Sequence, residues 1–99
     1  MCEFKIIKKN DGSQILEDIV ILSYNDHHEL ICTDVLGIGE NLKSAIILNV
    51  NTLNQTCTVL EHPLIQDFLK LVLDINNGSS RKEQIEAIQN QLEKIKAAI

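Results

Sequence analysis

Short runs in which apolar and polar residues alternate fill the first 61 residues of the chain, the pattern of strands with one buried face. The runs are rich in β-branched residues and are separated by turn residues about every 8–12 positions. Strands are expected over residues 3–9, 14–24, 29–36, 41–50 and 56–61. Because no helix interrupts them, the pattern predicts a small, bent, five-stranded antiparallel β-barrel.

Two local signals refine this prediction. Asp11-Gly12 is a turn sequence, since Gly12 tolerates a positive φ and Asp11 can bond its own backbone. Residues 14–24 form a run longer than the usual strand, so a bend or bulge is expected near Glu17 and Asp18.

The pattern changes to a helical one at His62-Pro63. Proline at the first helical position loses no hydrogen bond, so His62 is expected to be the N-cap. The residues that follow are apolar around most of the circumference, which predicts a helix buried on two sides. Asn76-Asn77-Gly78 supplies a residue suited to a left-handed C-cap.

A second helix is expected after Ser80, which forms a capping-box pattern with Glu83. Its apolar residues recur at spacings of three and four and form a narrow seam: Ile85, Ile88, Leu92, Ile95 and Ile99. A seam of this kind suits helix pairing, either within the chain or across a dimer. The sequence thus divides into a barrel domain, residues 1–61, and a helical hairpin, residues 62–99, packed on the barrel or in a dimer interface.

The net charge of −5 is unevenly distributed. Residues 1–61 hold four lysines against nine carboxylates, whereas residues 62–99 hold five basic and five acidic side chains. An acidic barrel repels phosphate. Only Phe4, Tyr24 and Phe68 are aromatic, so a base-stacking platform is not expected and a nucleic-acid partner is disfavoured.

Three cysteines without C-x-x-C spacing, no secretion signal and no long apolar span favour a reduced, cytoplasmic protein with no membrane segment. No nucleophile, base and acid motif is present, and Gly37 and Gly39 lack the third glycine of a dinucleotide loop. An enzyme is therefore not expected.

Cys2 is the strongest candidate for chemistry. If Met1 is removed, Cys2 offers both an α-amine and a thiolate, which close a five-membered chelate ring and suit nickel or copper better than magnesium or calcium. One chain supplies at most half of a metal's ligands, so such a site requires a homodimer with two Cys2 residues facing each other. The alternative is a second-position cysteine with no role.

The chain resembles the CooT family of small cytoplasmic proteins. The segments that carry the resemblance are Met1-Cys2, the turn with Asp11-Gly12, and residues 15–19, 32–37, 47–51 and 58–61. The resemblance implies a bent β-barrel that dimerises, Cys2 as a nickel ligand and service to a nickel enzyme. The family has also been labelled as predicted RNA-binding, and its typical members lack the hairpin of residues 62–99.

The remaining candidates have simpler interpretations. His27 and His28 are expected to lie in a polar turn, and His62 to act as a helix cap. Cys32 and Cys57 are expected in the core, because free cysteine behaves as a small buried hydrophobe.

The sequence therefore predicts a nickel-binding accessory protein, a metallochaperone that stores nickel or delivers it to a client enzyme. Two alternatives remain: an RNA-binding barrel, whose only basic cluster is Lys5, Lys8 and Lys9, and a structural or adaptor protein acting through its helices.

Overall fold

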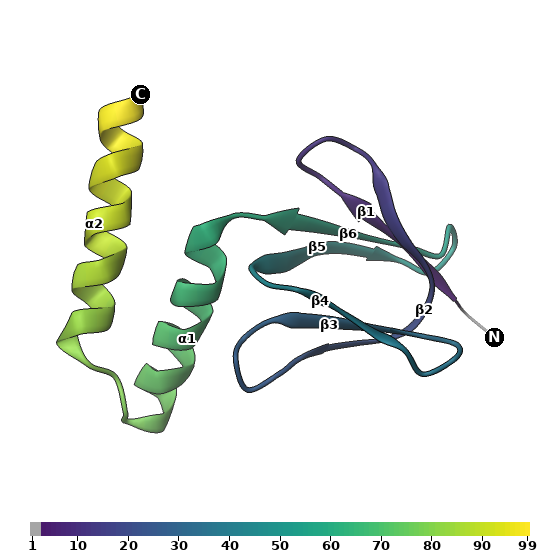
Figure 1. Ribbon diagram of the computed structural model, residues 1–99, viewed down its shortest axis with the longest axis horizontal. Coiled ribbons are helices and arrows are strands. Elements are labelled where there is room, and N and C mark those ends of the chain that lie inside the picture. Colours follow the sequence, from purple (N-terminus) through teal and green to yellow (C-terminus); the bar gives the residue numbers. More distant parts are fainter. Residues whose placement is uncertain (1–2) are drawn as a thin grey trace.

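A computed structural model describes residues 3–99 of the chain, which form a sheet followed by two helices (Figure 1). The prediction of a mainly β protein with a C-terminal helical hairpin is confirmed. The elements, in order, are β1 (Phe4–Lys8), β2 (Gln14–Tyr24), β3 (Leu30–Asp34), β4 (Gly39–Leu42), β5 (Ala45–Asn51), β6 (Thr56–Glu61), α1 (Pro63–Asn77) and α2 (Lys82–Ala98).

The sheet differs from the expected five-stranded closed antiparallel barrel. It has six strands in the order β4-β3-β2-β1-β6-β5 and is open, because β4 and β5 lie at its two edges. The central pair, β1 and β6, runs parallel, with Ile6 opposite Cys57. All other neighbouring pairs are antiparallel.

The sixth strand arises because the chain turns at Lys43-Ser44, inside the strand expected over residues 41–50. The Ser44 hydroxyl donates to the His62 carbonyl and accepts from the Gln66 amide, so it is bonded to the start of α1 instead of a strand. Only two residues separate the edge strands, so the Cα atoms of Leu42 and Ala45 lie no more than about 11 Å apart. The open sheet is therefore strongly curled.

The concave side of the curl holds the core. Seven residues from five strands form one buried cluster: Ile6, Ile19, Leu30, Cys32, Ala45, Cys57 and Val59. The Tyr24 hydroxyl donates to the Ala45 carbonyl at 2.7 Å and so joins β2 to β5 across the curl. The fold is thus stabilised mainly by aliphatic burial inside the sheet.

The bend predicted near Glu17 and Asp18 is confirmed. Asp18 has φ 58°, and the register between β1 and β2 shifts by one residue between Phe4 and Ile6. A second shift in the same pair lies between Ile6 and Ile7, and a third lies between β2 and β3, after Ile19. An extra residue on the bulged strand increases its local twist, which helps the long β2 follow the curl.

The two helices begin and end largely as expected. The His62 Nδ1 accepts from the Leu64 amide at 3.1 Å, and Gly78 closes α1 with φ 73°. The second cap is different: Arg81, not Ser80, precedes α2, and its amide donates to the Gln84 side chain at 2.8 Å.

The hairpin is only lightly packed. α1 runs beside β5 and has no buried residue, so the expectation of a helix buried on two sides is wrong. α2 packs on α1 of the same chain, with Ile88 as its one buried residue. Hydrogen bonds from Gln84 to Asp74 and from Gln91 to Asp67 tie the pair together.

The molecule is elongated, with extents of 44 × 34 × 21 Å. Figure 1 shows the hairpin at one end of the long axis and the beginning of the chain at the other. Within residues 3–99, neither helix has the length and apolar character needed to cross a membrane.

Candidate functional site

The predicted metal ligand, Cys2, lies outside the described residues, but the strand that follows it is firmly placed. Phe4 lies opposite Ile19 of β2, and the Lys5 amide donates to the Gln55 carbonyl at 2.9 Å. β1 is therefore held from both sides at its first residues. Two turns flank this point: residues 51–55, which lead into β6, and residues 34–38, which follow β3.

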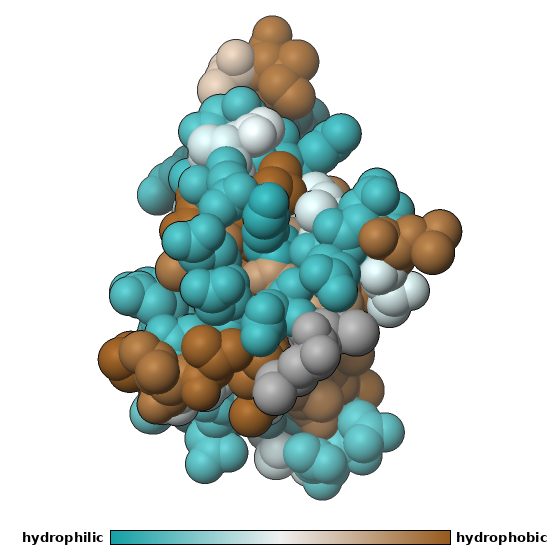
Figure 2. All heavy atoms as spheres, turned by 90° about the vertical axis from the view of Figure 1, so that its right-hand side faces the viewer, coloured by the Kyte–Doolittle hydropathy of each residue, from teal (hydrophilic) through white to brown (hydrophobic). Residues whose placement is uncertain are grey.

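Exposed apolar side chains gather around this end of the sheet. The Val35 amide donates to the Asp18 carbonyl, which places the turn of residues 34–38 beside the β2 bulge. Figure 2 looks onto this end and shows apolar surface across the lower half of the view. The strand-end patch, as we name it, comprises Val20, Val35, Leu36, Ile38 and Leu53, among which Leu36 is 79 % and Leu53 95 % exposed.

The sequence carries a signal for this patch that the strand prediction overlooked. A strand is expected over residues 29–36, but β3 ends at Asp34, and Val35, Leu36 and Ile38 are exposed. An apolar run that is interrupted by a glycine such as Gly37 is typical of a turn. Apolar side chains in a turn do not face the core, so they are exposed. Exposed apolar patches on a small protein commonly mark contact surfaces.

Carboxylates near this end are used within the fold. One Asp34 oxygen accepts from the amides of Leu36 and Ile38 at 2.9 and 3.0 Å and so shapes the turn. Within residues 3–99, no three His, Cys, Asp or Glu side chains come together as a metal site would require. The described part of one chain therefore offers Cys2 no ready set of additional ligands.

The two internal cysteines lie where they were expected. Cys32 and Cys57 are fully buried, free thiols in the core cluster. Burial raises the pKa of both thiols, that of Cys32 to about 11, with the neighbouring Cys57 adding to the effect. A buried neutral thiol is a poor nucleophile and a poor metal ligand, so both residues serve packing.

The raised pKa of Cys32 predicts a loss of stability at alkaline pH. The folded state favours the neutral thiol, so this contribution is complete below the unfolded pKa near 9 and is lost as the pH rises towards 11. We expect urea denaturation to show the free energy of unfolding falling by on the order of 2 kcal/mol between pH 9 and 11. A Cys32→Ala variant should show a shallower decline, and an equally steep one would contradict the assignment.

The histidines occupy turn and cap positions. His28 has φ 61° in the turn between β2 and β3, and the Asn25 side chain accepts from the His27 amide. The His27 carbonyl accepts from the Gln66 side chain at 2.7 Å, which ties this turn to α1. His62 caps α1. These contacts account for the three residues structurally.

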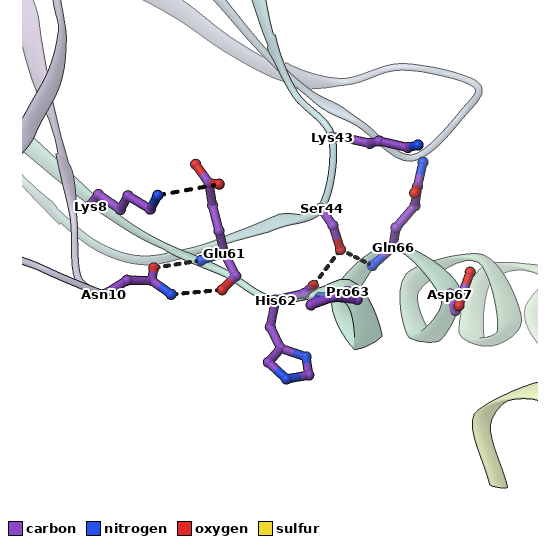
Figure 3. Close-up of a pocket in the computed structure, with 9 residues that line it drawn as sticks. All are labelled: Lys8, Asn10, Lys43, Ser44, Glu61, His62, Pro63, Gln66 and Asp67. Atoms are coloured by element: carbon purple, nitrogen blue, oxygen red, sulfur yellow. Dashed lines mark hydrogen bonds and ion pairs between the residues drawn. The ribbon is translucent and has the colours of Figure 1, made fainter. Parts of the chain in front are cut away.

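A cavity of about 610 Å³ lies where the sheet meets α1 (Figure 3). A helix start beside two lysines could bind an anion. Here the first free amides already have partners: those of Leu64 and Ile65 donate to His62, and that of Gln66 donates to Ser44.

Lys8 and Asn10, on another wall of this cavity, are also paired, whereas the Lys43 side chain makes no hydrogen bond or ion pair among the described residues. Lys8 lies 3.8 Å from the Glu61 carboxylate, and the Asn10 side chain exchanges two hydrogen bonds with the Glu61 backbone. Figure 3 shows these contacts on one wall and the Ser44 contacts beside the helix start. The cavity is therefore a structural junction. Its hydrogen bonds fix the β1–β2 turn to the end of β6 and fix the start of α1 to the same region.

The aromatic residues Phe4, Tyr24 and Phe68 lie on three separate elements and do not form one surface on which bases could stack. Phe4 packs against the core from β1, Tyr24 bonds Ala45, and Phe68 is exposed on α1.

The chain matches no protein-family model, and no curated protein matches it significantly.

Proposed function

We propose that this protein is a nickel-binding accessory protein that stores nickel or delivers it to a nickel enzyme, using Cys2 of two chains in a homodimer. The observation that carries the proposal is the sequence Met1-Cys2 directly before a strand that is anchored from its first residues. The nickel ion is the cargo and no reaction is catalysed.

The anchoring of β1 favours a defined site. Cys2 precedes Phe4 by two residues in the sequence, and the backbone of Phe4 is held by β2. A thiolate and an α-amine on one residue provide two of the four ligands of a square-planar ion. The second pair comes from the other chain.

The strand-end patch offers the surface on which two chains can meet. The turns that carry most of its apolar residues flank the first residues of β1, so a two-fold axis through the patch would bring the first strands of two chains together. Residues 1–61 carry nine carboxylates against four lysines, and this field favours a divalent cation. A bound cation also offsets the repulsion between two acidic sheets.

Titration of tag-free protein with Ni(II) tests the proposal. Intact mass first verifies that Met1 is absent. We expect thiolate-to-metal charge-transfer absorption that saturates at one Ni(II) per two chains, while zinc and magnesium at equal concentration compete poorly. Absence of binding would refute the function, and saturation at one ion per monomeric chain would refute the shared site.

A further inference from the structure

The helical hairpin presents one polar and one apolar face. The polar face holds a small cavity lined by charged and amide side chains from both helices: Asp67, Lys70, Arg81, Glu83 and Gln84, with Ala87. The other side has an entirely apolar groove of about 290 Å³, lined by Ile46, Leu64, Ile65, Phe68, Leu69, Ile88 and Leu92. A helical hairpin with one polar and one apolar face typically packs its apolar face against a further layer of structure.

Exposed apolar residues extend this groove along both helices. Leu64, Phe68, Val72 and Ile75 follow at spacings of four, four and three, which places them on one side of α1. Ile85 and Leu92 of α2 are seven residues apart, which is two turns. The hairpin face, as we name it, comprises Phe68, Val72, Ile75, Ile85 and Leu92, all between 44 and 56 % exposed.

The hairpin lacks a core of its own. Only Ile88 is buried among the residues of α1 and α2, and the groove would hold roughly ten waters against apolar walls. Helices of 15 and 17 residues gain most of their stability from packing of the apolar face. Covering the hairpin face would therefore stabilise both helices.

We propose that a second copy of this chain covers the hairpin face, so that two hairpins pack into a four-helix bundle around a two-fold axis. Charge favours this occupant. Residues 62–99 carry five basic and five acidic side chains, so two hairpins approach without net repulsion, unlike two acidic sheets. Because the hairpin has no net charge, a partner with a net positive or negative charge gains no electrostatic attraction from it.

Shape and area point the same way. Phe68 lines the groove and Val72 follows one turn later on α1, so the groove and the exposed apolar residues lie on the same side of one hairpin, which is what an isologous contact requires. Each half-exposed side chain shows on the order of 100 Å², so the five residues of the hairpin face provide roughly 500 Å², more than half of the ~800 Å² that one partner contributes to a standard interface. The packing matches the common four-helix solution.

This interface is independent of the metal site. The hairpin and the beginning of the chain lie at opposite ends of a molecule 44 Å long (Figure 1). Association through the hairpin therefore leaves the strand-end patch free, and it does not require nickel.

Light scattering of the full-length, metal-free protein tests the inference. We compare the parent with Phe68→Lys/Leu92→Lys, with Phe68→Glu/Leu92→Glu, and with the polar-face control Lys70→Gln. Each charged variant should have half the mass of the parent, an equimolar mixture of the two should regain the parental mass, and the control should be unchanged. A monomeric parent, or charged variants with the parental mass, would overturn the proposal.

Amide exchange of the parent gives a second measurement that needs no variant. Dilution through the dissociation range should accelerate exchange in α1 and α2 by about tenfold or more, while β1 and β6 keep their rates. Uniform exchange in the helices across a range in which the mass halves would show that another surface makes the dimer. Loss of nickel binding, in contrast, leaves both outcomes unaffected.

Discussion

Ile6→Ala is expected to lower the free energy of unfolding by about 3–4 kcal/mol, the range for a large aliphatic side chain removed from a packed core. Ile6 is fully buried at the centre of β1, the strand that pairs with both β2 and β6. Loss of its side chain leaves a cavity at the parallel pair β1–β6, which joins the two antiparallel parts of the sheet. Urea denaturation followed by circular dichroism measures the change.

Ile21→Ala is the matched control, because it removes the same atoms from a β2 residue that is 54 % exposed. Its cost should stay below about 1 kcal/mol, since most of that side chain is already in contact with water. Equal losses at the two positions would mean that the core does not lie inside the curl of the sheet.

Features set by neighbouring residues were predictable from the sequence. The bulge at Asp18, the His62 cap and the Gly78 cap each depend on the conformational preferences of a few residues. The burial of Cys32 and Cys57 was also predictable, because free cysteine behaves as a small buried hydrophobe and Cys57 lies between Thr56 and Thr58 along its strand. Such local conformational preferences act on the chain before its strands pair with one another.

The sheet topology was not predictable in the same way. The break at Lys43-Ser44 contains no glycine, proline or asparagine, and its reason is a contact from Ser44 to residues about 20 positions further along the chain. The parallel pairing of β1 with β6 joins strands about 50 residues apart. Neither contact leaves a local pattern in the sequence.

The helices show a related limit. The apolar residues of α1 correctly predict a helix, but the burial on two sides that they also predict is not found. Periodicity identifies an apolar face and says nothing about what covers it. Here Phe68 and Val72 remain exposed because the sheet reaches only part of α1.

The candidate site was likewise predictable only in part. Cys2 and its ligand chemistry follow from the sequence, whereas the surface around it follows from the turns that β2, β3 and β6 bring together. The structure also separates the hairpin from the strand-end patch. The hairpin and the first residues of β1 lie at opposite ends of the molecule, so the hairpin does not border the strand-end patch of its own chain.

Two controls isolate the contributions to nickel binding. Cys57→Ser should retain the nickel affinity of the parent, because this thiol is buried in the core and has a raised pKa. A Gly-Ser extension before Cys2 keeps the thiolate and removes its free amine, so it should weaken binding by an intermediate factor. Parental affinity in the extended protein would exclude the amine as a ligand.

Cys2→Ser is expected to raise the nickel dissociation constant by about 100-fold or more and to abolish the charge-transfer absorption, because a hydroxyl stays protonated and is a far weaker ligand than a thiolate. Thermal stability should change little, since β1 is anchored at Phe4 and Lys5. Affinity of the parent should also fall as the pH is lowered, because protons compete for the thiolate and the amine. Isothermal titration at pH 6.5 and 8 measures both effects. An unchanged affinity in Cys2→Ser would assign nickel binding to other residues and leave the strand-end patch without its proposed cargo.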